Sequence, residues 1–179
     1  MNILIFTLVI LGTIITSTMY ASVFEWVLHK HVMHKKPFGF NYAYKHHHQI
    51  HHVVFGGYKT YKLSGHKPEK QEKDKKTIPM AWWNWIVLLI IAVSPIAATI
   101  SIFFGVWFPA VVTAIIFFLY YCTYEYTHWC MHDSKGRWFE NKKWFLNLDH
   151  RHRLHHQNTN TNFNVVWPFA DFLLKTLRT

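Results

Sequence analysis

Cysteine is scarce in this chain of 179 residues: only Cys122 and Cys130 are present. They form neither a Cys-X-X-Cys pair nor a zinc-type spacing. If one helix carries both, the eight-residue separation puts them about two turns apart, too far for a disulfide. The sequence therefore gives no sign of a disulfide framework, and we interpret both cysteines as packing residues.

Charge is almost missing from two long stretches. Residues 1–28 carry one charged side chain, Glu25, and residues 80–127 also carry one, Glu125. All 19 Lys and Arg lie elsewhere, 11 in residues 29–79 and 8 in residues 128–179. A net charge of +10 would permit nucleic acid as a partner. The segregation of charged residues from the two apolar stretches instead favours a membrane protein that does not bind nucleic acid, because a charged group in hydrocarbon is energetically expensive.

The uncharged stretches are long enough to cross a bilayer. A helix over 2–28 rises about 1.5 Å per residue and spans a hydrocarbon core of about 30 Å. The second stretch has room for two crossings, over 81–104 and 108–127, with Gly105 to Pro109 as the break. A cleaved signal peptide at residues 2–24 is the competing interpretation, although its basic n-region is missing. The sequence predicts an all-α integral membrane protein with about three transmembrane helices, one plus a hairpin.

Three crossings would place every Lys and Arg on one side of the membrane, which the positive-inside rule assigns to the cytoplasm. A Lys-rich stretch over 56–79 is expected to be a solvated loop. The chain length suits a single domain over 1–179. We therefore expect a helical, histidine-rich cap on the cytoplasmic face.

Histidine is abundant, with 15 residues, and most of it falls in four clusters. On an α-helix, His-X-X-His-His directs three imidazoles to one face, and His-X-X-X-His directs two. His29 and His34 are five residues apart, which is off-face on an α-helix, so we expect one of them to lie where the helix ends. Five further histidines are not predicted to be metal ligands: His31, His46, His47, His66 and His150. The candidate metal ligands are His29, His34, His48, His51, His52, His128, His132, His152, His155 and His156.

Ten candidate imidazole ligands are too many for one metal ion and suit two. Neutral imidazole binds iron, zinc, copper and nickel, and a closed zinc site uses about four ligands. Iron is favoured if the task is to activate O2, because zinc has no redox chemistry. The ligand set alone leaves the metal open.

These clusters resemble the boxes of the fatty acid hydroxylase/sterol desaturase superfamily of membrane di-iron enzymes. The matching segments are 25–34, 48–52, 124–132 and 152–156. The tail from Asn162 to Thr176 resembles the family's closing pattern, with Asn164 and Lys175 where the family usually has glycine. The resemblance covers most of the chain except the Lys-rich loop.

The resemblance implies that the ten histidines bind two iron ions, with O2 as co-substrate and no catalytic residue beyond the metal cage. The implied reaction is hydroxylation or desaturation of a lipid taken from the bilayer. Groups that would orient the ligands are Lys30, Tyr124, Glu125, Asp149 and Arg153.

The electrons for this reaction would come from a partner, since the chain contains no flavin or nicotinamide fingerprint. A cytochrome b5, or a ferredoxin with its reductase, is implied. A fatty acyl or sphingolipid chain is the favoured substrate, with carotenoid or sterol hydroxylation as alternatives. The expected location is the endoplasmic reticulum of a eukaryote or the inner membrane of a bacterium.

A membrane metal-binding or transport protein is the alternative from another class. A transport protein needs a pathway of polar or ionisable side chains within its spans. Glu25 and Glu125, near the ends of the spans, are the only charged side chains in the two apolar stretches. The sequence therefore favours the enzyme over this alternative.

Overall fold

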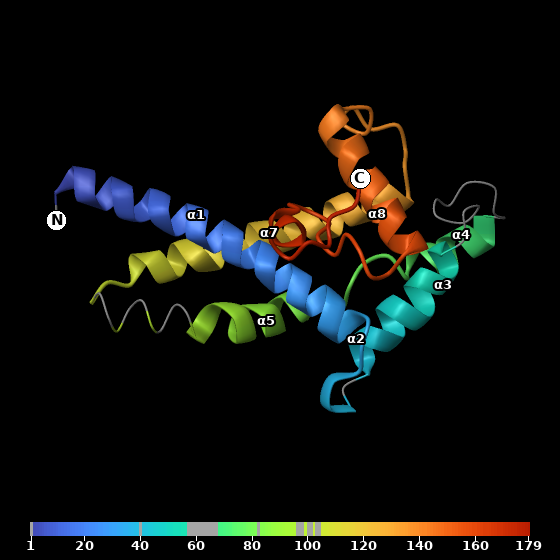
Figure 1. Ribbon diagram of the computed structural model, residues 1–179, viewed down its shortest axis with the longest axis horizontal. Helices are drawn as coiled ribbons and strands as arrows, with labels where there is room; N and C mark the ends of the chain where they lie inside the picture. The colour runs from blue at the N-terminus through green and yellow to red at the C-terminus, as the bar shows by residue number, and fades with distance from the viewer. Residues whose placement is uncertain are drawn as a thin grey trace.

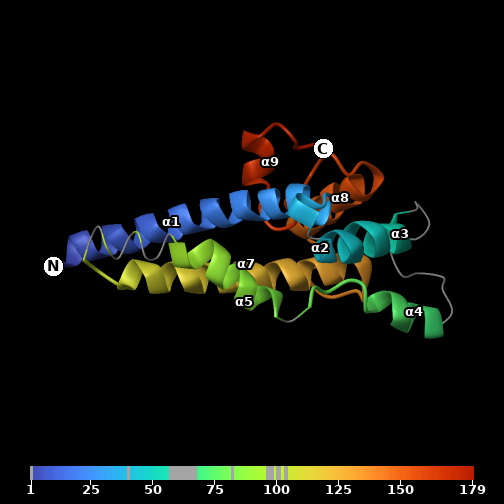
Figure 2. The same ribbon diagram turned by 90° about the horizontal axis from the view of Figure 1, so that it is seen from below.

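The computed structural model describes residues 2–39, 41–56, 68–81, 83–95, 99, 102 and 105–179. These residues form helices and connecting segments and contain no strand. Two long helices, α1 (Ile3–Leu28) and α7 (Phe108–His132), lie side by side along the long axis (Figures 1 and 2). The predicted all-α class is therefore confirmed for the described residues.

Among the described residues, two helices are long and apolar enough to cross a membrane: Ile3–Met33 and Phe108–His132. The first consists of α1 and the π-helix η1 (His29–Met33) that continues it. Apolar side chains near its start point outward, with Ile3 83%, Leu8 59% and Ile15 59% exposed. Such an apolar surface suits contact with lipid, because the removal of apolar side chains from water is favourable.

The predicted third span, 81–104, is described only in part. It contains α5 (Asn84–Leu88) and the π-helix η4 (Leu89–Val93), an apolar segment shorter than a span. Residues 82, 96–98, 100, 101, 103 and 104 lie outside the described residues. The third span thus stays a prediction.

The ends of α7 follow from its sequence. Gly105 has a φ of 63° and Pro109 lies in the first turn of α7, so the chain breaks where the hairpin was predicted to turn. The predicted span 108–127 lies within α7, which continues to His132 and so carries His128 and His132 on the same helix. The last turn of α7 is buried at His128, Met131 and His132. The two histidines therefore lie on a packed part of the helix and not beyond its end.

The prediction of a loop over 56–79 is wrong in part. Residues Pro68–Lys75 form helix α4, whereas 57–67 lie outside the described residues. Proline at the first helical position, Glu69 in the first turn and lysines in the last turn all favour a helix. The many charged residues of this segment indicated a solvated loop. An interpretation from composition alone does not use these helix-end signals.

The remaining helices lie around the C-terminal ends of α1 and α7 (Figure 2). The short 3-10 turn η2 (Pro37–Gly39) leads into α2 (Tyr42–Tyr44), the π-helix η3 (Lys45–His51) and α3 (His52–Phe55). Helix α8 (Lys143–Gln157) follows α7, and α9 (Phe169–Leu173) packs against α1 (Figure 2). This arrangement brings the four histidine clusters to one end of the α1–α7 pair.

Two smaller expectations concern cysteine and the tail. Cys130 is buried in the core as expected, but Cys122 is exposed on α7 and is not a packing residue. Lys175 has a φ of 58°, in the left-handed region that glycine adopts most readily. Lys175 therefore adopts a backbone conformation that glycine would take at lower energetic cost.

Candidate metal centre

Ten of the described histidines form two groups of five, each of which could hold a metal ion. Within each group, one ring nitrogen from every residue lies within 4.8 Å of those of the others. The first histidine group contains His29, His34, His47, His52 and His155. The second histidine group contains His51, His128, His132, His152 and His156.

Two π-helices produce the geometry of the first group. In a π-helix the amide of residue i+5 bonds to the carbonyl of residue i, so side chains five apart lie above one another. The His34 amide donates to the His29 carbonyl at 3.1 Å, and the His52 amide donates to that of His47. His34 is the C-cap of η1, so the expectation that one of the pair lies where a helix ends is confirmed. The π-helical turn also brings the two rings together, stacked with centroids 5.1 Å apart.

The same π-helical register replaces one predicted ligand with another. His47, which was not predicted to be a ligand, is buried in the first group, with its Nε2 2.9 Å from that of His29. His48, a predicted ligand, is half-buried beside the group, with its Nδ1 2.9 Å from the Nδ1 of His34. The structure therefore brings together nine of the ten predicted residues, with His47 in place of His48. The second five-residue spacing, from 47 to 52, was the signal that could have identified His47.

The His-X-X-His-His clusters are divided between the two groups. On α8, His155 belongs to the first group, whereas His152 and His156 belong to the second. His52 and His51 are divided in the same way. The second group is completed by His128 and His132, one α-helical turn apart on α7. The groups are adjacent, since the rings of His52 and His156 stack with centroids 4.2 Å apart.

The spacing of the nitrogens suits a shared ion. Nε2 atoms lie 2.9 Å apart between His132 and His152, and 3.1 Å apart between His34 and His155. Ligands at about 2.1 Å from one ion are separated by about 3.0 Å when they subtend a right angle, and by about 3.4 Å in a tetrahedron. The observed spacing is therefore compatible with nitrogens that share one ion within each group.

Buried ring nitrogens without a hydrogen-bond partner also favour metal binding. Within the described part of the chain, the Nε2 atoms of His51 and His128 are buried and have no hydrogen-bond partner. Both belong to the second group. A bound metal would satisfy these lone pairs, which otherwise carry the desolvation penalty of buried polar atoms.

Backbone carbonyls accept hydrogen bonds from the Nδ1 atoms of several imidazole rings in the two groups. The Nδ1 of His29 donates to the Phe163 carbonyl at 2.5 Å, and that of His155 donates to the Thr161 carbonyl at 2.7 Å. In the second group, the Nδ1 of His51 donates to the Thr77 carbonyl at 3.2 Å, and His128 bonds to the backbone of Ile78. Such bonds place the proton on Nδ1 and leave Nε2 free for a metal. Glu125, expected to orient a ligand, instead accepts a hydrogen bond from the Met80 amide.

Burial keeps the imidazoles neutral, as metal ligation requires. Desolvation, reinforced by repulsion from His155 and His48, lowers the pKa of His34 to about 2. Desolvation also lowers the pKa values of other histidines well below their usual range: His47, His51, His52, His152, His155 and His156. The groups thus present unprotonated nitrogens at neutral pH.

This burial predicts that acid destabilises the metal-free protein. The unfolded histidines have pKa values of about 6.5, and the folded values are lower, so below that pH the unfolded chain binds more protons. Stability should therefore fall as the pH drops through about 6.5, by up to about 1.4 kcal/mol per pH unit for each such histidine. Thermal unfolding of chelator-treated protein in detergent should show a much lower Tm at pH 5.5 than at pH 8. An unchanged Tm would contradict the burial of these rings.

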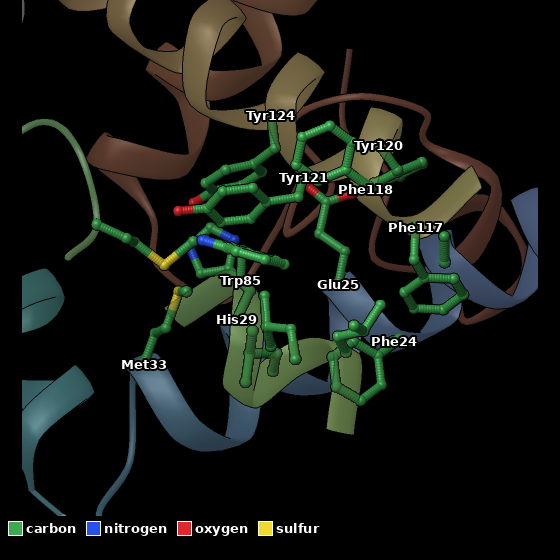
Figure 3. A pocket seen from close by; sticks show the side chains of 15 residues that line it. Phe24, Glu25, His29, Met33, Trp85, Phe117, Phe118, Tyr120, Tyr121 and Tyr124 are labelled. Carbon is green, nitrogen blue, oxygen red and sulfur yellow. Dashed lines mark hydrogen bonds between the residues drawn. The ribbon is translucent and has the colours of Figure 1, made fainter. Parts of the chain in front are cut away.

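An apolar cavity of about 810 Å³ reaches both groups. It is lined by side chains from α1, η3, residues 76–81 and α5–η4, and it touches His47 of the first group and His51 of the second. A smaller cavity of about 60 Å³, between α1, α5–η4 and α7, reaches His29 (Figure 3). The two share lining residues, namely Phe24, Leu28, Met33, Met80 and Leu88.

No protein-family model, curated protein or solved structure matched the chain. The case for a function therefore comes from the residues of this site.

Proposed function

We propose that the protein is a membrane di-iron oxygenase that hydroxylates or desaturates a lipid, with a fatty acyl or sphingolipid chain as the favoured substrate. The observation that carries this proposal is the pair of adjacent five-histidine groups at the wall of one large apolar cavity. A metal-storage site has no need of such a cavity. A lipid-modifying enzyme must place an apolar chain next to its metals.

The histidines would hold the two ions, and the imidazole donor set fits iron. When bound, the iron pair would supply the activation of O2 that breaks an unactivated C–H bond. The protein's own residues would do the rest. The Phe163, Thr161 and Thr77 carbonyls orient the rings, and the apolar lining holds the substrate chain and excludes water.

The size and lining of the cavity support a lipid substrate. A volume of about 810 Å³ lies within the range of about 300–1,000 Å³ typical of small-molecule sites. Its walls include the membrane-length helix α1, through Phe24, Val27 and Leu28. We infer that the substrate enters from the bilayer and that the histidine-rich end faces the cytoplasm, where the basic residues lie.

An external electron donor is part of the proposal. The 19 Lys and Arg all lie in the two segments that bear the histidines. A basic face of this kind would favour encounter with an acidic partner such as cytochrome b5 or a ferredoxin.

The test is metal analysis of detergent-purified protein from iron-replete cells, with Mössbauer spectroscopy on iron-57-enriched material. We expect two irons per chain and a coupled di-iron signal, after which lipid analysis of the expressing cells would identify the product. One zinc, or mixed metals below one per chain, would overturn the di-iron proposal and favour metal handling.

Blocking the cavity should abolish turnover without loss of metal. Ala81 lines the cavity and belongs to neither histidine group, and Ala81→Trp would fill space that the substrate chain needs. We expect product formation to fall by more than about 10-fold while two metals remain bound, a loss of about 1.4 kcal/mol or more in transition-state binding. The control is Ile90→Trp on η4, which is 60% exposed and does not line the cavity. Equal product from both variants would exclude this cavity as the substrate site.

A further inference from the structure

Two short backbone segments form hydrogen bonds with the imidazole rings of the two histidine groups, one segment with each group. Residues 161–163 offer the Thr161 and Phe163 carbonyls to His155 and His29, both of the first group. Residues 77 and 78 bond to His51 and His128, both of the second group. In these four hydrogen bonds between described residues, each segment bonds to one group.

The first segment is fixed by the carboxylate of Asp171, which is completely buried. Its Oδ1 accepts from the Phe163 amide at 2.9 Å and from the Thr176 hydroxyl at 2.7 Å. Its Oδ2 accepts from the Asn164 amide at 2.7 Å. Asp171 thus holds the peptide unit that carries the Phe163 carbonyl on the side opposite His29.

A second buried carboxylate holds the same segment against α1. Glu25 lies one turn before His29, and its Oε1 accepts from the Val165 amide at 2.7 Å. Its Oε2 accepts from the Asn164 side chain at 2.9 Å and from the Tyr120 hydroxyl at 2.7 Å. The segment is therefore fixed to the helix that carries His29.

The second segment has its own carboxylate. The Met80 amide donates to Oε2 of Glu125 at 3.1 Å, and the Thr77 amide and hydroxyl donate to the Asp74 carbonyl at the end of α4. Ile78, between these two anchors, is buried against Phe55. Glu125 comes from α7, one turn before His128 is reached. The arrangement repeats that of Glu25 and His29 on the other long helix.

We propose that Asp171 and Glu25 position the first histidine group and Glu125 the second, so that each metal site depends on its own carboxylate anchor. This inference rests on the proposed two-metal function. All three are positioning residues, since they act through a backbone segment and an imidazole ring. Outer-shell partners of this kind typically change metal affinity by roughly 10–100-fold when they are altered.

The test compares Asp171→Asn and Glu125→Gln in the full-length, detergent-purified protein, by titration with Fe(II) and metal counting. We expect each variant to bind one metal as tightly as the wild type and the other roughly 10–100-fold more weakly. Glu140→Gln is the matched control. The Glu140 carboxylate is also buried and multiply hydrogen-bonded, to Ser134 and Gly136 among others, but it fixes neither segment.

Combination with ligand variants shows which site is affected. Asp171→Asn added to His155→Ala should leave one metal bound with wild-type affinity, because both act on the first group. Added to His156→Ala, it should leave one metal that binds roughly 10–100-fold more weakly, because only the first group then remains. Thr176→Val removes a hydroxyl that donates to Asp171 and accepts from the Trp26 indole N–H but leaves the Asp171 carboxylate in place, so it is a milder variant for use if Asp171→Asn does not fold. It should weaken the same single site.

Wild-type affinity at both sites in Asp171→Asn and Glu125→Gln would overturn the inference while leaving the two-metal function standing. Equal weakening of both sites by either variant, or by Glu140→Gln, would show a merely structural role and would also overturn it. A wild-type chain that binds fewer than two metals would overturn the proposed function, and this inference with it.

Discussion

Replacing His47 by alanine is expected to remove one of the two metal ions, whereas His48→Ala should leave both in place. The Nε2 of His47 lies 2.9 Å from that of His29 and 3.1 Å from that of His52, inside the first group. His48 lies beside the group and is half-buried. Loss of an outer-shell partner already weakens metal binding by roughly 10–100-fold. Loss of a ligand itself should exceed that, so His47→Ala should also reduce product formation to background.

The measurement is metal content and product yield of both variants, purified in parallel. Gln49→Ala serves as a control for general damage, since Gln49 is exposed on the same π-helix and does not line the cavity. If His48→Ala lost the metal and His47→Ala kept it, the π-helical register would be wrong and α-helical spacing would apply.

Adjacent histidines on α8 should control different metals. His155→Ala is expected to empty the first group, and His156→Ala the second, each leaving one ion per chain. The reason is geometric: His155 has its Nε2 3.1 Å from that of His34, and His156 has its Nε2 3.1 Å from that of His152. Each single variant should lose more than about 100-fold in affinity at its own site, by the same comparison with outer-shell partners.

Pairs of variants make this division testable. His155→Ala with His47→Ala should retain one metal, because both substitutions fall in the first group. His156→Ala with His47→Ala should retain none. If both pairs behaved alike, the ten histidines would form one shared cluster and not two sites.

Much of the helical framework could be predicted from the sequence. The absence of charge from residues 1–28 and 80–127 indicated the apolar helices, and Gly105 with Pro109 marked where α7 begins. The local end signals around Pro68 and Glu69 were also present, but the net composition of the Lys-rich segment obscured them. Helix type and approximate ends depend on neighbouring residues, so they are accessible from local sequence.

The sequence by itself determined which side chains the candidate site uses: nine of the ten predicted histidines fall in the two groups. Spacing could not determine how they are divided, because His51 and His52, like His155 and His156, are neighbours in the chain but face different groups. The π-helical register at His29–Met33 and Lys45–His51 adds one residue to a turn, which brings in His47 and displaces His48. Only the tertiary structure decided this register, because packing of α1, η3, α7 and α8 against one another selects it, and no local preference in those residues does.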